Sequence, residues 1–177
     1  MLTSTEAAVL GLLIEEGEQS GYDLSRQAAR SVGYFWSPVQ SRMYATLPQL
    51  VERGFARSRE VVESNRFKQL YRITPAGKSA LREWLHEPPE DQPDRNPLLL
   101  KLFLADGAEA DDAILLEHVR EKRRAAEQLR DELVELEAAG AGETTPYAGF
   151  TREYGRRWAE MMIGWTTEVE RVLARRA

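Results

Sequence analysis

The chain has 177 residues, with 24 Lys and Arg against 29 Asp and Glu, and a formal net charge of −5. This length fits one domain of ordinary size or two small ones, and the absence of Cys excludes disulfides and Cys-ligated metal sites. No apolar run reaches the roughly 18 residues that a membrane span needs, and the N-terminus lacks the basic start of a secretory signal. We therefore expect neither a leader nor a membrane segment, and the acidic total argues against nucleic acid as a partner.

The charge is unevenly distributed along the chain. Between Ser20 and Arg82, eleven basic residues stand against four acidic ones, which makes this window +7 and the remainder −12. Such an asymmetry indicates a surface for a polyanion on an otherwise acidic body. Composition alone does not separate this interpretation from chance clustering.

Two helices are predicted at the N-terminus. The first begins with a capping box, in which Thr3 caps the backbone and Glu6 reaches back, and it ends at Gly17. Its apolar face is formed by Ala7, Leu10, Leu13 and Ile14. The second helix begins near Ser20, and its inward-facing residues are Tyr22, Leu24 and Ala28.

A third helix, a β-hairpin and a fourth helix follow. Ser37 caps the third helix and Pro38 occupies its first position. Pro48 lies inside this helix and removes a backbone hydrogen bond, so we expect a kink or an early end. Segments 55–62 and 67–74 are rich in β-branched and aromatic residues around a polar turn, which predicts the hairpin. The fourth helix spans 76–85. The buried stripe of the third helix is Val39, Met43, Leu47, Leu50 and Val51.

This order of elements is that of a winged helix-turn-helix, within a mainly α fold. The third helix turns small and polar side chains away from its apolar stripe, which would let it enter a major groove. Arg42 and Gln40 carry donor groups suited to base edges, whereas Ser37, Ser41 and Tyr44 could position phosphates.

The hairpin tip carries a second set of candidate DNA contacts. Asn65, Arg66 and Lys68 lie where a wing would meet the phosphate backbone or a minor groove. Each of these residues taken singly is more simply explained as a solvated surface position. The order of elements together with the +7 window is what makes DNA the specific interpretation.

A second domain is predicted after residues 87–97, which hold four Pro and no other apolar residue and predict a semi-rigid linker. We expect a winged-helix domain over 1–86 and a helical dimerisation domain over 98–177. Its first long helix carries a heptad stripe at Leu115, Val119, Lys122, Ala126, Leu129, Leu133 and Leu136.

The last predicted helix carries an aromatic stripe at helical spacing. Such a stripe is more often core or dimer interface than ligand site, although Met and aromatic side chains also suit a pocket for a flat hydrophobic ligand. The candidate effector or dimer contacts are Tyr147, Phe150, Tyr154, Trp158 and Trp165.

Enzyme chemistry has little support in the sequence. His86 and His118 stand apart without a ligand pattern, and the loop around Gly140 lacks the preceding strand and the Lys of a phosphate-binding loop. We expect no catalytic residues, no metal site and no cofactor.

Several linked motifs resemble the PadR family of transcriptional regulators. They are VLGLL (9–13), SGYDL (20–24), Ser37-Pro38 with Met43-Tyr44 and Leu47, LVERG (50–54) and YRITPAG (71–77). Segment 96–103 is similar to the longer-tailed branch of that family. The resemblance implies a dimeric, cytoplasmic repressor whose C-terminal helices pair the subunits and whose DNA affinity a small molecule lowers. The wing departs from the family, since NRFKQ (65–69) replaces a more basic run with Pro.

Two functions remain open. The first is a homodimeric repressor that binds an inverted repeat in double-stranded DNA and is released by a small hydrophobic or phenolic effector. The alternative is a winged-helix module for protein–protein interaction, in which the basic face meets an acidic protein without DNA or effector. The small, polar start of the third helix beside a basic wing favours DNA.

Overall fold

The computed structural model describes residues 1–15, 17–36, 40–63, 66–89, 96–105, 111–138 and 146–176, with the backbone alone at 40, 41, 63 and 66. The chain forms two compact units, Met1–Asp91 and Gln92–Ala177. Residues 90–95 of the predicted linker lie outside the described residues, so the linker and the domain bounds set by it stay predictions. None of the helices in the described ranges is long and apolar enough to cross a membrane.

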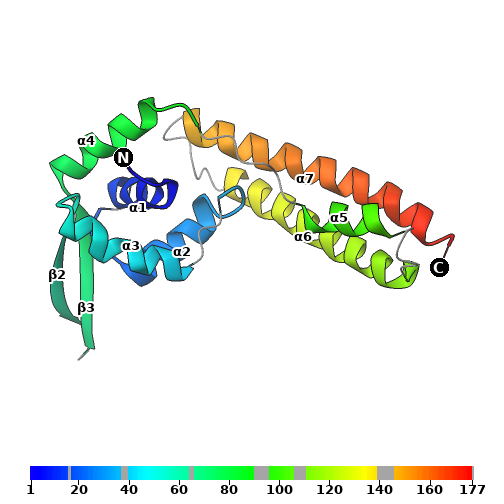
Figure 1. The fold of residues 1–177 in the computed structure, drawn as a ribbon, viewed down its shortest axis with the longest axis horizontal. Helices are drawn as coiled ribbons and strands as arrows, with labels where there is room; N and C mark the ends of the chain where they lie inside the picture. The colour runs from blue at the N-terminus through cyan, green and yellow to red at the C-terminus, as the bar shows by residue number, and fades with distance from the viewer. Residues whose placement is uncertain are drawn as a thin grey trace. The chain divides into compact units, whose positions relative to one another are not determined.

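The first unit is a winged helix-turn-helix, which confirms the predicted fold class (Figure 1). Its elements are α1 (Ser4–Glu15), β1 (Gln19–Ser20), α2 (Gly21–Ser31), α3 (Gln40–Glu52), β2 (Ala56–Glu63), β3 (Arg66–Ile73) and α4 (Pro75–His86). The strands form an antiparallel sheet in the order β1-β3-β2. The sequence did not predict β1, because two residues are too few to show an alternating pattern.

The start of α1 has the predicted capping box. The backbone N–H of Thr3 donates to Oε2 of Glu6 at 2.7 Å, and the backbone N–H of Glu6 donates to Oγ1 of Thr3 at 3.3 Å. The helix ends at Glu15, and Gly17 follows with φ of +79°, which glycine adopts without strain.

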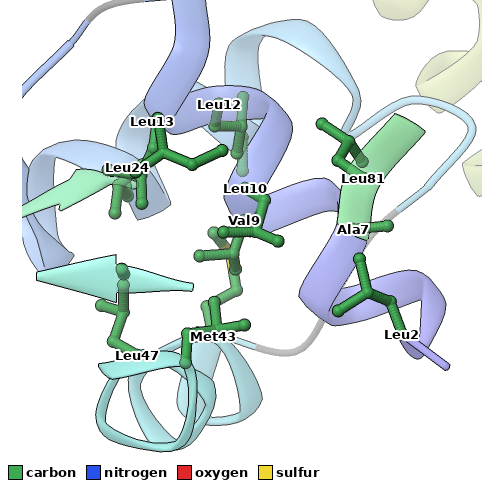
Figure 2. Close-up of a cluster of buried hydrophobic side chains, with 14 residues drawn as sticks. Leu2, Ala7, Val9, Leu10, Leu12, Leu13, Leu24, Met43, Leu47 and Leu81 are labelled. Carbon is green, nitrogen blue, oxygen red and sulfur yellow. The ribbon is translucent and has the colours of Figure 1, made fainter. Parts of the chain in front are cut away.

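The core of this unit surrounds α1 (Figure 2). Two parts of the predicted pattern are wrong, because Ile14 and Tyr22 are exposed. In α2 the buried positions are Gly21, Leu24 and Ala28, a spacing of three and four that turns Tyr22 outward, where its ring lies 6.0 Å from the guanidinium of Arg26. The fully buried side chains of this core are Val9, Leu10, Leu13, Leu24, Leu47 and Leu50.

Helix α3 continues past Pro48 to Glu52, so the expected early end is wrong. Leu47 and Leu50 on either side of the proline are both buried, and this burial holds the helix together where one backbone hydrogen bond is missing. The kink stays a prediction. Met43 is also buried, as expected, whereas Val39 lies outside the described residues.

An ion pair fastens the end of α3 to the start of α1. Nη1 of Arg53 lies 2.5 Å from Oε1 of Glu6, whose side chain is almost fully buried. Burial opposes the ionisation of Glu6, but hydrogen bonds from Thr3 and Arg53 outweigh it and leave the pKa of this carboxyl below its ordinary value.

The second unit is helical and contains α5 (Pro97–Leu104), α6 (Asp112–Ala138) and α7 (Pro146–Leu173). The helices α6 and α7 pack antiparallel: Nε of Arg176 lies 2.9 Å from Oδ2 of Asp112, and Nε of Arg120 lies 2.8 Å from Oε1 of Glu170. The buried residues of α6 include Leu115, Val119, Ala126 and Leu133 of the predicted heptad stripe.

The aromatic residues of the α7 stripe do not form the core of this unit, so the dimer interface and the ligand site remain as the predictions for them. The residues facing α6 lie one position later along the helix, which is a rotation of about 100°, and the small side chains of Gly155 and Ala159 allow close approach. Tyr147, Phe150, Tyr154 and Met161 are therefore between 54% and 76% exposed. Trp158 and Trp165 are half-buried, and Nζ of Lys122 lies 5.2 Å from the centre of the Trp158 ring.

Replacing Glu6 by Gln should reduce the free energy of unfolding by about 2 kcal/mol at neutral pH, because Arg53 loses its charged partner and a buried acceptor is weakened. Since the pKa of Glu6 is lowered by folding, its contribution is complete above the unfolded-state value of about 4.3 and disappears as pH falls through the folded-state value. Urea denaturation from pH 7 to pH 3 measures this.

The matched control is Glu52→Gln, which alters an exposed carboxylate on α3 and should change stability little at any pH. A difference between Glu6→Gln and the wild-type chain that persists unchanged at pH 3 would contradict the assigned role of the ion pair.

Candidate nucleic-acid interface

Four of the five predicted contact residues of the third helix, Gln40, Ser41, Arg42 and Tyr44, belong to the first two turns of α3. Arg42 is exposed and Tyr44 is 41% exposed, while Met43 between them is buried in the core. Gln40 and Ser41 belong to the first turn of α3, although their side chains, like the whole of Ser37, lie outside the described residues. The core contact of Met43 thus turns Arg42 and Tyr44 away from the interior.

Helices α2 and α3 approach each other closely at Gly21. A Cβ atom on Gly21 would lie 2.6 Å from Cε1 of Tyr44 and 3.3 Å from Cδ1 of Leu47. Glycine therefore leaves the space in which the Tyr44 ring rests at the start of α2. Gly21 belongs to the SGYDL motif noted in the sequence. The need for glycine at this position depends on its contact with α3, which the sequence alone does not show.

The start of α2 is also tied to the wing. Oγ of Ser20 accepts from the backbone N–H of Asp23 at 3.2 Å and donates to Oδ2 of Asp23 at 2.7 Å. Nζ of Lys68 on β3 lies 3.2 Å from the same carboxylate oxygen. The hydroxyl of Ser20, with Lys68 adding to its effect, holds the pKa of Asp23 below its ordinary value. Lys68 is therefore a half-buried, paired cation.

Other basic residues of the +7 window have partners that sequence reasoning missed. The guanidinium of Arg59 binds the carboxylate of Glu18, with Nε 2.9 Å from Oε1, and Arg53 is held by Glu6. Residues 1–86 include eleven basic and nine acidic residues, so the net charge of this segment is only +2. Among the described side chains of this unit, the cations without a hydrogen bond or ion pair are Arg26, Arg30, Arg42, Arg57, Arg72, Lys78 and Arg82.

The wing exposes an apolar pair that was not predicted as a contact. Val62 and Phe67 face each other across β2 and β3, one pair from the last pair before the turn, and are 66% and 77% exposed. Apolar side chains at such a position can pack against deoxyribose or wedge into a minor groove. Asn65 lies outside the described residues, and of Arg66 only the backbone is described.

Within the described part of the chain, no group of three or more His, Cys, Asp or Glu side chains is placed to hold a metal ion. The features that remain are an outward-facing polar helix, a wing and exposed cations. They define a winged-helix protein of the nucleic-acid-binding class.

Comparison with known proteins gives the family. Residues 9–83 match the transcriptional regulator PadR-like family, and residues 95–174 match the virulence activator alpha C-terminal family. Residues 9–83 thus belong to the PadR-like family of transcriptional regulators, as the motifs in this segment indicated. Because members of this family are transcriptional regulators, the expectation that the chain is not an enzyme is also confirmed.

Individual relatives agree with this. The chain is 37% identical over 100 residues to the negative transcriptional regulator PadR of Bacillus subtilis, which is 54% of this chain and 53% of that regulator. The match therefore spans about half the length of this curated relative. The structure of smu.1604c from Streptococcus mutans is 27% identical with a TM-score of 0.82, over 98% of this chain and 99% of that one.

Bacillus subtilis PadR has been solved in two complexes that share this fold. With operator DNA, the TM-score is 0.76 at 21% identity, over 97% of this chain and 99% of that one. With p-coumaric acid, the TM-score is 0.66 at 20% identity, over 98% of this chain and 99% of that one.

Proposed function

We propose that this chain is a homodimeric transcriptional repressor that binds an inverted repeat in double-stranded DNA and is released by a small aromatic effector. The observation that carries the proposal is the outward face of α3, where Arg42 is exposed and has no side-chain partner among the described residues. A guanidinium in that position suits a bidentate contact with the O6 and N7 atoms of guanine.

The other proposed DNA contacts surround Arg42 on the same unit. Gln40 would read a base edge, whereas Ser37, Ser41 and Tyr44 would position phosphates near the start of α3. On the wing, Asn65, Arg66 and Lys68 would contact the backbone, and for Lys68 a phosphate would take the place of Asp23. The exposed Val62 and Phe67 supply the apolar part of this contact.

The same apolar pair is the one observation that favours the alternative, a winged-helix module for protein–protein interaction, because exposed apolar side chains also mark protein interfaces. The two functions differ in their response to DNA sequence, since a protein-binding module has no reason to prefer one duplex over another.

Arg42→Ala should relax sequence preference at one base pair, with a loss of about 1–3 kcal/mol of discrimination, whereas Lys68→Ala should weaken binding to all duplexes alike. A preferred duplex is first selected from random sequences, and fluorescence anisotropy then measures each variant against that duplex and its single-base changes. Arg82→Ala, which removes an exposed cation from α4, is the control. Identical behaviour of the Arg42 and Lys68 variants would refute the assignment of helix and wing.

Dimerisation is supported by the apolar surface that the second unit exposes. No residue of α5 is fully buried, and Phe103 is 83% exposed. Tyr147, Phe150 and Tyr154 of the α7 stripe are exposed as well. Surfaces of this kind mark association sites, and a two-fold dimer would place two α3 helices in major grooves about 34 Å apart. The exposed apolar residues of α5 are Leu99, Leu100, Phe103 and Leu104.

Placing a charge on this surface should separate the subunits. Phe103→Glu and Tyr154→Glu should each sediment as monomers at micromolar concentration, where the wild-type chain sediments as a dimer, because the carboxylate would have to be buried. Arg171→Glu, on the polar face of α7, introduces the same group and should leave the dimer intact. A wild-type chain that sediments as a monomer would contradict the proposal.

The effector is proposed to bind beside Trp158 and Trp165. Both rings are half-buried on the aromatic stripe, and the ammonium of Lys122 lies over the Trp158 ring, where it could meet the negative charge of a phenolic acid. The p-coumaric acid bound by Bacillus subtilis PadR is a ligand of this kind.

Small phenolic acids should quench tryptophan fluorescence and release the selected duplex at the same concentrations. Trp158→Phe should remove much of the quenching, and Trp84→Phe on α4 should not. A fluorescence signal that stays constant across a broad panel of planar aromatic compounds would count against the effector.

A further inference from the structure

A cavity of about 440 Å³ opens at the base of the hairpin, within the first unit. Its walls come from the end of α1, from β2 and β3, and from the start of α4. The hairpin projects away from α4 (Figure 1), and the strand residues that line the cavity belong to the end of the hairpin opposite the wing tip. None of the proposed DNA or effector contacts whose side chains the structure describes lines it.

The walls of this cavity are of two kinds. Three cations line it, Arg57 on β2, Arg72 on β3 and Lys78 on α4. Among the described residues, the remaining large side chains of the lining are aliphatic and none is aromatic; they are Leu13, Ile14, Ile73 and Pro75. Ile14 was predicted to face the core but is exposed. An apolar ligand in the cavity would cover this side chain.

The two arginines are direct partners across the antiparallel strands. Like charges in that position destabilise a sheet unless an anion lies between them. Neither Arg57, Arg72 nor Lys78 has a hydrogen bond or an ion pair in the described part of the chain. A nearby carboxylate among the described residues is Glu18, whose pKa is lowered first by its hydrogen bond from Arg59 and then by the positive charges of Arg59, Arg72 and Arg57. Glu18 is thus already engaged by Arg59.

The cavity walls are held firmly by the backbone. A Cβ atom on Gly77 would lie 2.1 Å from the carbonyl oxygen of Phe55, so the start of α4 rests directly on the residue before β2. The N–H of Thr74 donates to the same carbonyl at 3.0 Å. Gly17, which has a positive φ, also lines the cavity, and it contributes no side chain to fill it.

From these features we infer that the hairpin base is a binding site for a small aliphatic carboxylate. The carboxylate lies between Arg57 and Arg72, which match its planar geometry with paired N–H donors, and Lys78 adds a third charge. The alkyl chain lies on Ile14 and Pro75, the two aliphatic lining residues that are exposed. A cavity of this volume is within the range of small-molecule sites, and its aliphatic lining separates this ligand from the planar aromatic effector. The inference does not depend on DNA binding.

The probe is sodium octanoate, titrated into the full chain by isothermal calorimetry, with octanamide as the neutral analogue of equal length. Octanoate should bind at one site per chain, and octanamide should bind at least tenfold more weakly because it lacks the charge. Arg57→Gln and Arg72→Gln should each weaken octanoate at least tenfold, while Arg82→Gln, an exposed α4 cation outside the cavity, should bind as the wild-type chain does.

Thermal unfolding shows that the variants fold and provides a second readout. Without octanoate, Arg72→Gln should melt at the same temperature as the wild-type chain or higher, because it removes a like-charge pair. Octanoate should raise the melting temperature of the wild-type chain but not that of Arg72→Gln. Absence of octanoate binding at millimolar concentration, equal binding of octanamide, or unchanged binding by both arginine variants would each overturn the inference.

Discussion

The position of every functional group in the first unit depends on the burial of α1. Val9, Leu10 and Leu13 are almost completely withdrawn from solvent, and α2, α3, α4 and β3 all contact this helix. Removing such side chains from water supplies about 1.5–3 kcal/mol each, so the neighbouring elements have one strongly preferred arrangement around it. Because Met43 and Leu47 must face this core, the other side of α3, with Arg42 and Tyr44, must face outward.

The net charge of a segment does not show which of its basic side chains are available to bind an anion, because several of them form ion pairs within the protein. The total of −5 hides a +7 window, but Glu6 and Glu18, which lie before that window, bind two of its arginines. Asp23 within it binds Lys68. Each of these three ion pairs connects two segments of the unit. The first connects α1 with the end of α3, the second connects the segment before β1 with β2, and the third connects α2 with β3. The described cations of this unit that have no hydrogen bond or ion pair are the ones available to anions. Arg42 lies on α3 and three of them lie at the hairpin base, while the others lie on α2 and on α4.

Much of the first unit was predictable because its signals are local. A capping box, a change from helical to alternating periodicity and the prolines at helix starts depend on neighbours in the sequence. The exposure of Tyr22, the approach of Gly21 to Tyr44 and the pairing of Lys68 depend on elements far apart in the chain. The stripe of α7 was assigned correctly as a helix face, but its contact with α6 is decided by the small residues Gly155 and Ala159. Side-chain size across an interface is not visible in the hydrophobic pattern of one helix.

The claim that the first unit binds DNA through its exposed cations is tested most directly by the salt dependence of that binding. Each phosphate neutralised by Lys or Arg releases counterions, so the logarithm of the affinity falls linearly with the logarithm of salt concentration. For a selected duplex measured from about 50 to 200 mM salt, several phosphate contacts per dimer predict a loss of roughly 10³-fold or more. An affinity that hardly changes over this range, or that is equal for any acidic polymer, would contradict the account.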